Sequence, residues 1–222
     1  MTRSAARKDP VACVLLAAGG SSRLGRPKQL VRHRGVPLLH HAVAVARAAL
    51  PSSPLVVVVG AYSLRVRALL QRTHSGARVV GNPLWREGMA SSLRAGLAAV
   101  PRDSRAALVL LVDQPHVDAA SLARLLHAWS RRRGVPAAAR YAGRVGAPAI
   151  LPRRHWRALA RLDGDRGARA MLRGGGARTL VDMPEAAFDV DTAADLAALT
   201  RVGRHRAACT AGAARARRSA GA

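Results

Sequence analysis

Residues 16–28 have the clearest chemical character in this chain. They read Leu-Ala-Ala-Gly-Gly-Ser-Ser-Arg-Leu-Gly-Arg-Pro-Lys, so that small residues precede the cations Arg23 and Lys28. With no bulky side chain at positions 17–20, backbone N–H groups can approach phosphate oxygens closely, and the cations add fixed positive charge. The segment predicts a triphosphate-binding loop. An ordinary glycine-rich turn with basic residues facing water is the alternative that composition leaves open.

Two familiar phosphate-binding loops do not match this segment. Gly20 and Gly25 have the separation found in a Walker A loop, but Arg26-Pro27 stands where that loop needs Lys followed by Ser or Thr. The sequence also lacks the dinucleotide fingerprint Gly-x-Gly-x-x-Gly. The predicted loop is therefore of another kind.

Asp113 is the second residue with a chemical role to explain, because it directly follows the apolar run 108–112. A carboxylate at the end of a buried strand can hold Mg²⁺ while water and phosphate oxygens complete the coordination shell. Capping of the following helix is the alternative role, although Asp118 is better placed for that. Asp113 is therefore the first candidate for a metal ligand.

A second carboxylate often shares such a metal ion, and Asp165, Asp189 and Asp191 are the candidates. Asp191 also fits the N-cap of a helix over residues 192–199, and Asp165 could instead neutralise a nearby arginine. No Ser-His-Asp arrangement can be argued from the spacing. The chemistry indicated is that of phosphate groups and a metal ion.

Apolar runs and helical periodicity alternate along the chain, which predicts alternating strands and helices. The predicted strands are residues 11–16, 55–59, 77–80 and 106–112, with shorter candidates at 135–141, 146–151 and 178–181. The predicted helices are residues 37–50, 63–72, 88–100, 119–132, 153–162, 167–172 and 192–199. This order predicts an α/β fold with a mostly parallel sheet, helices on both sides, and a ligand beyond the carboxyl ends of the strands.

The ends of the chain differ from its body. Residues 1–10 and the basic segment 201–222 are expected to be disordered tails around one domain at 11–200. The net charge of +25 invites a nucleic-acid interpretation. However, aromatic residues make up only 3% of the chain and the arginines are scattered among Ala and Gly, so a base-stacking surface is not indicated.

The sequence also bears on the compartment. No apolar run reaches the roughly 18–20 residues that a membrane span needs, and no signal peptide is recognised. The two cysteines, Cys13 and Cys209, form neither a disulfide framework nor a zinc site. We expect a cytoplasmic protein without a membrane partner.

The segment Leu-Ala-Ala-Gly-Gly-Ser-Ser-Arg-Leu-Gly-Arg-Pro-Lys-Gln-Leu resembles the signature loop of the nucleotidyltransferases that activate molybdopterin and of their wider family. Its Ala-Ala-Gly start is similar to the cytidylyl members, since the guanylyl members usually have Ala-Gly-Gly. Further likenesses extend over about 11–200, with one departure, at Ala147, where the family usually has His. The resembling segments are Asn82-Pro83, Gly88-Met89-Ala90-Ser91-Ser92-Leu93, Val112-Asp113-Gln114-Pro115, Gly146-Ala147-Pro148-Ala149, Gly164-Asp165-Arg166-Gly167-Ala168-Arg169 and Asp189-Val190-Asp191-Thr192.

This resemblance implies a Rossmann-like three-layer α/β/α sandwich of the nucleotide-diphospho-sugar transferase type. It implies transfer of CMP from CTP to the phosphate of the molybdopterin cofactor, with release of pyrophosphate and with Mg²⁺ as cofactor. A molybdoenzyme or its chaperone is a further expected partner.

The site residues follow from the residue types together with the resemblance. The catalytic residues expected are Arg23, Lys28 and Asp113, with Asp113 and Asp189 as metal ligands. The nucleotide-binding residues expected are Ala17, Ala18, Gly19, Gly20, Ser21, Arg23, Lys28, Asn82, Ser91 and Ser92. The acceptor-binding residues expected are Pro148, Asp165 and Arg169. Turn or helix-start roles are the alternatives for Asn82, Ser91 and Ser92, and a surface turn is the alternative for residues 164–169.

Other functions stay open on the sequence alone. GTP or another nucleoside triphosphate could be the donor, and a sugar phosphate or polyol phosphate could be the acceptor. A basic nucleic-acid-binding module is the alternative of another class. Its binding would weaken steeply with salt and would not depend on Asp113.

Overall fold

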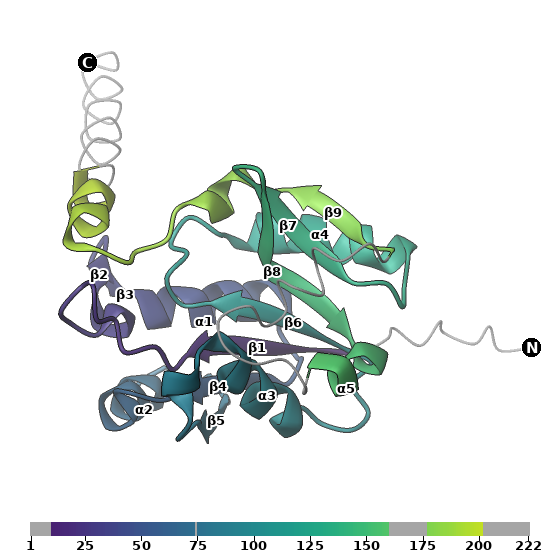
Figure 1. Cartoon of the computed structure of the whole chain (residues 1–222), viewed down its shortest axis with the longest axis horizontal. Coiled ribbons are helices and arrows are strands. Elements are labelled where there is room, and N and C mark those ends of the chain that lie inside the picture. Colours follow the sequence, from purple (N-terminus) through teal and green to yellow (C-terminus); the bar gives the residue numbers. More distant parts are fainter. Residues whose placement is uncertain (1–9, 74, 160–176, 202–222) are drawn as a thin grey trace, which may run out of the picture.

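A mixed β-sheet runs through the centre of the protein (Figure 1). The computed structural model describes residues 10–73, 75–159 and 177–201. Within those residues the sheet has seven strands in the order β5-β4-β1-β6-β8-β7-β9. The strands are β1 (Val11–Ala17), β4 (Leu55–Val59), β5 (Arg78–Gly81), β6 (Ala106–Leu111), β7 (Ala137–Tyr141), β8 (Arg144–Pro152) and β9 (Thr179–Asp182).

Strands β5, β4, β1 and β6 run parallel and bring their carboxyl ends to one edge. Leu16 of β1 pairs with Val58 of β4 on one side and with Leu111 of β6 on the other. The loops that follow these three strands therefore leave the sheet side by side. The segment after β1 and Asp113 after β6 meet there, as expected for a ligand site in an open α/β sheet.

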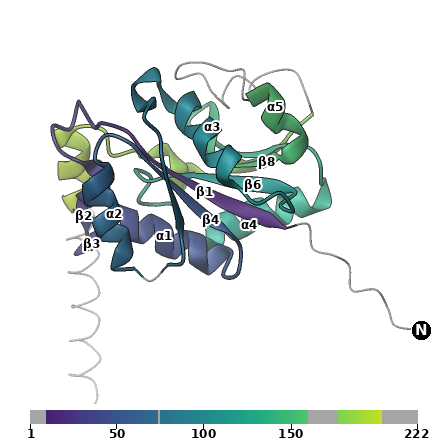
Figure 2. The ribbon, with the colours of Figure 1, turned by 90° about the horizontal axis from the view of Figure 1, so that it is seen from below.

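Helices cover both faces of the sheet and complete three layers (Figure 2). One face is covered by α1 (Leu38–Ala49), α2 (Ser63–Gln71) and α4 (Ala119–Arg131). The other is covered by α3 (Met89–Ala99) and α5 (Trp156–Leu159). A small hairpin of β2 (Arg32–His33) and β3 (Val36–Pro37) precedes α1, and a further helix occupies residues 193–201.

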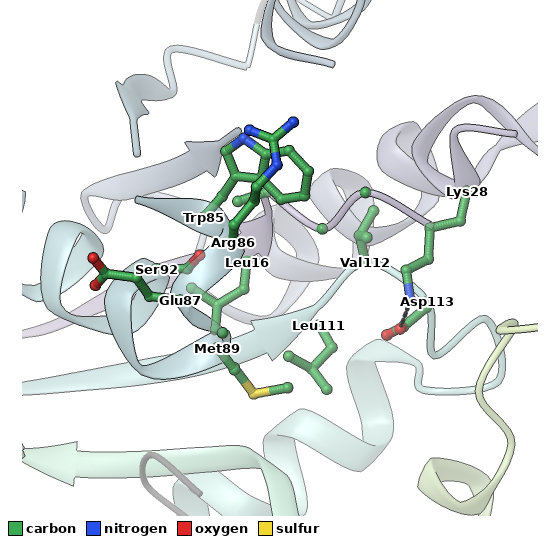
Figure 3. Close-up of a pocket in the computed structure, with 14 residues that line it drawn as sticks. Leu16, Lys28, Trp85, Arg86, Glu87, Met89, Ser92, Leu111, Val112 and Asp113 are labelled. Carbon is green, nitrogen blue, oxygen red and sulfur yellow. Dashed lines mark hydrogen bonds and ion pairs between the residues drawn. The ribbon is translucent and has the colours of Figure 1, made fainter. Parts of the chain in front are cut away.

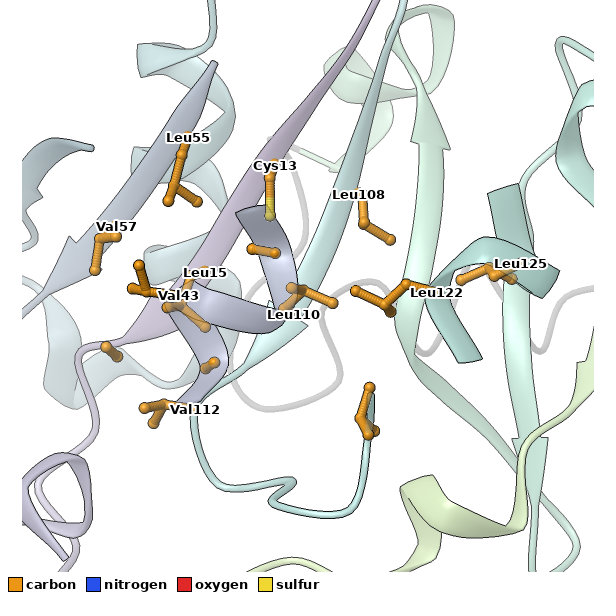
Figure 4. Close-up of a cluster of buried hydrophobic side chains, with 14 of the residues drawn as sticks. Cys13, Leu15, Val43, Leu55, Val57, Leu108, Leu110, Val112, Leu122 and Leu125 are labelled. Carbon is orange, nitrogen blue, oxygen red and sulfur yellow. The ribbon is translucent and has the colours of Figure 1, made fainter. Parts of the chain in front are cut away.

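The alternating direction of side chains along β1 divides the core in two. Cys13 and Leu15 face the layer of α1 and α4, as Figure 4 shows, while Val14 and Leu16 face α3. All seven residues of β1 are buried, which explains the continuous apolar run. Burial also raises the pKa of the Cys13 thiol to about 12, so this cysteine is a packing residue.

One glycine allows helix α3 to pack directly against the sheet. A Cβ atom at Gly96 would lie 2.5 Å from Val14 Cγ1 and 2.9 Å from Val58 Cγ2, which is closer than side chains approach. The helix can therefore settle directly on β1 and β4. This contact seats the C-terminal half of α3 against β1 and β4.

A third, smaller apolar cluster holds the predicted loop against the C-terminal part of the domain. Leu24 of the loop packs with Leu38, Val190 and Leu199, all of them buried. The packing draws residues 188–199 next to residues 24–38. Two segments that are far apart in sequence are thereby joined beside the ends of the strands.

Most predicted elements are confirmed, and so are the α/β class and the three-layer arrangement. The predictions left the direction of the later strands open: β8 is antiparallel to both β6 and β7, so the sheet is mixed beyond β6. The helix predicted at 167–172, the end of the one at 153–162 and nearly all of both tails lie outside the described residues. In the described part of the chain, no helix has the length and apolarity to cross a membrane.

One capping prediction is wrong. Thr192, and not Asp191, is the N-cap of the last helix, because Thr192 Oγ1 accepts the Asp195 amide at 3.2 Å and Asp195 Oδ2 accepts the Thr192 amide at 2.8 Å. This reciprocal pair is a capping box. It leaves the Asp191 carboxylate free to turn toward the loop after β1.

Candidate active site

Gln29 holds the start of the loop that follows β1. It lies in the short helix η1 (Lys28–Leu30) and is completely buried. Its Nε2 donates to the carbonyl oxygen of Ala17 at 2.8 Å and to that of Gly19 at 3.1 Å. Both carbonyls are thereby turned toward the protein interior. The sequence-based predictions missed Gln29, whose one signal was its position directly after Lys28.

The two remaining carbonyls of this turn are also bound by the protein. Ala18 O accepts from the amide of Ala61 at 3.1 Å, and Gly20 O accepts from the hydroxyl of Tyr62 at 3.0 Å. By contrast, no partner is found among the described residues for the amide groups of Gly19 and Gly20. The amides are therefore the polar groups that the turn offers to a ligand, and amides presented in this way bind anions.

Ser21 closes the second half of the loop. It adopts a left-handed conformation with φ of 51°, and its carbonyl accepts the amides of Leu24 and Gly25, each at 3.1 Å. Its Oγ accepts the amide of Lys28 at 3.1 Å. The loop thus folds back on itself and delivers Lys28 to the edge of the sheet.

Lys28 is the centre of a charged network. Its Nζ lies 2.5 Å from Asp113 Oδ2 and 2.8 Å from Asp191 Oδ1, and Arg23 pairs with the other oxygen of Asp191 at 2.9 Å. The side chains of Lys28 and Asp113 are each only 14% exposed. Burial opposes the charge on Lys28, but the two carboxylates outweigh it, so the pKa of Lys28 is raised.

Asp189 adds a third carboxyl group to this network. Its pKa is raised to about 6, first because it is buried and then because Asp113 and Asp191 are nearby and negative. A hydrogen bond from Gln114 and the charge of Lys28 oppose this shift without cancelling it. Such a crowded set of carboxylates is typical of a functional site.

The network contains carboxylate oxygens of the kind that a hard divalent cation binds. Asp113 Oδ1 and Asp189 Oδ1 are both buried and without a hydrogen-bond partner, and carboxylate oxygens are the ligands that Mg²⁺ and Mn²⁺ prefer. In the conformation described here the Lys28 ammonium supplies the positive charge. Among the described residues, no three acidic, histidine or cysteine side chains already converge as a formed metal site.

Asn82 and Ser91 build the second predicted loop from within. Asn82 Nδ2 donates to the hydroxyls of Ser91 and Ser92 at 2.9 and 3.0 Å, and its Oδ1 accepts the Leu84 amide at 3.0 Å. The single hydroxyl hydrogen of Ser91 is shared between the carbonyls of Leu84 and Gly88, each 2.8 Å from its Oγ. The polar groups of Asn82 are therefore used inside the loop, and Ser92 is the member of this group that lines the cleft.

Trp85 and Arg86 form one wall that the sequence-based predictions missed. A Cβ atom at Gly20 would lie 2.7 Å from Cζ3 of the Trp85 ring, so only glycine allows the ring to close against the loop. The Arg86 guanidinium lies over this ring, 4.3 Å from its centre. Nothing in the spacing indicates this contact, because it joins two loops that follow different strands.

These groups surround one cleft of about 630 Å³ (Figure 3). Trp85 and Arg86 lie on one side and the Lys28–Asp113 pair lies on the other. The lining residues are Leu16, Ala18, Gly19, Gly20, Lys28, Trp85, Arg86, Glu87, Gly88, Met89, Ser92, Leu111, Val112 and Asp113. A cleft of this volume, with free amides, a cation and carboxylates, can hold a nucleoside triphosphate.

The predicted acceptor-binding residues are less well placed. Pro148 is buried in β8 and does not line this cleft. Asp165 and Arg169 lie outside the described residues. The acceptor side of the site therefore stays a prediction.

Comparison with protein families gives one match that covers most of the chain. The model described as a MobA-like NTP transferase domain matches residues 13–183. Among curated proteins, the bifunctional protein GlmU of Sorangium cellulosum is 34% identical over 140 residues, which is 60% of this chain and 29% of that protein. The chain thus spans less than a third of this relative's length.

Solved structures give matches over nearly the whole length. Rv0371c from Mycobacterium tuberculosis is 32% identical with a TM-score of 0.73, and the match covers 87% of this chain and 99% of that one. A second structure of that protein, in complex with manganese, matches with 30% identity and a TM-score of 0.71 over 86% and 98% of the two chains. The molybdopterin-guanine dinucleotide biosynthesis protein A of Archaeoglobus fulgidus shares the fold at 17% identity and a TM-score of 0.57, over 86% and 97%.

Proposed function

The chain belongs to the MobA-like NTP transferase domain family, and from that membership we propose that it is a nucleotidyltransferase acting on a phosphorylated acceptor. We further propose that the donor is CTP and the acceptor is the molybdopterin cofactor, with release of pyrophosphate. The observation that carries the proposal is the shared cleft, in which the amides of Gly19 and Gly20 face Lys28 and Asp113.

The chemistry needs few protein groups. A phosphate oxygen of the acceptor attacks the α-phosphorus of the triphosphate, a new P–O bond forms, and the bond from the α-phosphorus to the bridging oxygen breaks. Pyrophosphate leaves with the electron pair of that bond. Because the attacking oxygen is already anionic, no general base is required, and positioning and charge stabilisation carry the catalysis.

Each residue then has a defined task. The amides of Gly19 and Gly20 bind the polyphosphate, while Lys28 and Arg23 neutralise the charge that grows on the leaving pyrophosphate. Asn82 and Ser91 hold the second loop in shape, and Ser92 and Trp85 contact the nucleoside. Pro148, Asp165 and Arg169 are proposed for the acceptor, on the strength of the motif resemblance.

A divalent cation completes the proposed site. Asp113 and Asp189 would hold it through the buried oxygens that lack partners. The manganese complex of the Mycobacterium tuberculosis protein supports a divalent cation in this family branch, and Mg²⁺ is our proposal here. When bound, the ion would supply positive charge to the phosphate oxygens.

Pyrophosphate release in the presence of CTP, acceptor and Mg²⁺ tests the activity directly. Asp113→Asn should lower kcat/KM by at least about 100-fold, because the carboxylate acts where charge develops. Asp182→Asn is the matched control, since Asp182 is an exposed carboxylate that pairs with Arg140 and does not line the cleft. Undiminished turnover in Asp113→Asn would remove Asp113 from the mechanism.

The choice of CTP rests on Ala18 in addition to the resemblance. Ala18 lines the cleft and is only 3% exposed, so its methyl group reduces the space beside the loop. Ala18→Gly should shift selectivity from CTP toward GTP by about tenfold, the usual effect of one methyl group in a pocket. Thermal stabilisation by the four nucleoside triphosphates measures it. If GTP stabilises the wild-type protein most, GTP replaces CTP as the proposed donor.

The product would pass to a molybdoenzyme or its chaperone, as the resemblance implies. Replacing molybdopterin by sugar phosphates or polyol phosphates in the same assay tests the acceptor. Turnover with one of those compounds and none with molybdopterin would overturn the proposed acceptor while leaving the nucleotidyl transfer in place.

A further inference from the structure

A second groove lies on the outer side of the loop that carries Lys28. It has a volume of about 480 Å³ and is separate from the cleft described above. Its lining residues are Arg26, Pro27, Leu30, Val31, Arg32, Arg65, Leu196 and Thr200. They come from the loop, the start of the β2–β3 hairpin, α2 and the helix at 193–201, which Figures 1 and 2 show gathered at one end of the molecule.

The charge of this groove is strongly one-sided. Three of its eight lining residues are arginines and none is acidic. Among the described residues, no ion pair or side-chain hydrogen bond is found for Arg26 or Arg65, and Arg32 bonds only to the carbonyl of Gly35. These guanidinium groups are therefore available to carboxylates, which they bind in bidentate fashion.

The same groove has an apolar component. Leu30, Val31 and Leu196 belong to its lining. Val36 and Leu64 are 44% and 83% exposed, and they lie in the β2–β3 hairpin and α2, two of the elements that line the groove. Apolar side chains beside unpaired cations are typical of a surface that binds another protein.

Electrostatics disfavours an occupant from this chain, because its own segments are basic. The segments 1–9, 160–176 and 202–222 each carry more arginine and lysine than acid, and the whole chain has a net charge of +25. A second copy or one of these segments would bring positive charge to a positive groove. A partner of the opposite charge is required.

We propose that this groove docks a segment of a partner protein in which Asp or Glu residues alternate with apolar side chains. Carboxylates would pair with Arg26, Arg32 and Arg65, and apolar side chains would contact Leu30 and Leu196. A single-stranded nucleic acid fits less well, because none of the eight lining residues is aromatic and bases would have no stacking partner.

Fluorescence anisotropy with a short labelled peptide of alternating Asp and Leu tests this proposal on the full chain at physiological salt. The double variant R26E/R65E should weaken binding by roughly tenfold or more, because two charge-assisted contacts become repulsive. The matched control is R102E/R157E, which changes the net charge equally at two exposed arginines outside the groove. It should weaken binding by less than about twofold.

Three comparisons complete the test. A peptide of alternating Asp and Ser should bind more weakly than the Asp–Leu peptide, since the apolar contacts are lost, and stabilisation by CTP should persist in R26E/R65E. Equal weakening by both double variants would overturn the proposal, because the peptide would then bind the general positive charge. Oligothymidylate binding that is stronger than peptide binding and is lost in R26E/R65E would also overturn it, in favour of a nucleic acid.

Discussion

Lys28 Nζ lies 2.5 Å from Asp113 Oδ2, although the two residues are 85 positions apart in the sequence. The cation of the phosphate-binding loop and the carboxylate at the end of β6 therefore neutralise each other. A triphosphate and a divalent cation would each replace one partner of this pair. The ion pair thus places a cation for the triphosphate and a carboxylate for the metal ion at the same point of the cleft.

Replacing Lys28 tests this relationship from the side of the cation. In Lys28→Met, triphosphate affinity should fall by about 10–100-fold, the value of one or two charge-assisted hydrogen bonds. Asp113 and Asp191 would lose their internal cation, so Mg²⁺ should stabilise this variant more than it stabilises the wild type. Calorimetry for CTP and thermal unfolding with and without Mg²⁺ measure both effects.

Arg26→Met, in the same loop but lining the other groove, is the control for Lys28→Met. Equal stabilisation of both proteins by Mg²⁺ would argue against a cation site at these carboxylates.

Gln29 should act on nucleotide binding through the backbone that it holds. In Gln29→Leu the carbonyls of Ala17 and Gly19 lose their donor, which costs about 1–3 kcal/mol of stability and disorders the adjacent amides. The KM for the triphosphate should rise about tenfold, while kcat at saturation falls less. Leu125→Ala, on the buried face of α4, is a control that destabilises the fold at least as much without touching the loop. A KM that rises equally in both variants would make Gln29 a general stability residue.

The raised pKa of Asp189 predicts how cation binding depends on pH. Its pKa of about 6 lies above the ordinary value of 3.8 because of burial and the neighbouring carboxylates. Below pH 6 the carboxyl is protonated and cannot hold a cation, so Mg²⁺ affinity should rise as the pH increases through 6. The same shift lowers stability as the pH rises from about 4 to above 6, because the unfolded chain ionises this group more easily. Calorimetric titration with Mg²⁺ on both sides of pH 6 should show the rise in the wild type and its loss in Asp189→Asn. An unchanged slope in the variant would assign the titration to another group.

Asp118 provides a test that is independent of the active site. Its carboxylate accepts the Ser121 amide at 2.8 Å and caps α4, as predicted, and this hydrogen bond lowers its pKa. The stabilisation is present above the ordinary pKa and is lost as the pH falls through the lowered one. Asp118→Ala should lose about 1 kcal/mol at pH 7 and progressively less at pH values below about 4. Urea unfolding across this range measures the difference, and a constant difference would contradict the capping role.

Local features of the site could be predicted because they depend on neighbouring residues. The apolar runs identified β1, β4 and β6, since a strand buried on both faces has no polar positions. Small residues after β1 identified the loop, and the carboxylate after β6 followed from the same pattern. The alternation of strands and helices predicted a parallel sheet, which places the loop after β1 and the carboxylate after β6 at one edge. The structure has both at that edge.

The contacts that complete the site depend on the tertiary structure. Lys28 meets Asp191 across 163 positions because Leu24 packs with Val190 and Leu199, and no periodicity encodes that packing. Trp85 closes on Gly20 because the loops after β5 and β1 leave the same edge of the sheet, with β4 between the two strands, and strand order is set by the whole core. Sequence alone therefore determined which residues can carry the chemistry, through local hydrophobic pattern and backbone freedom. Only the folded chain decided which of them touch, because those distances follow from packing between distant segments.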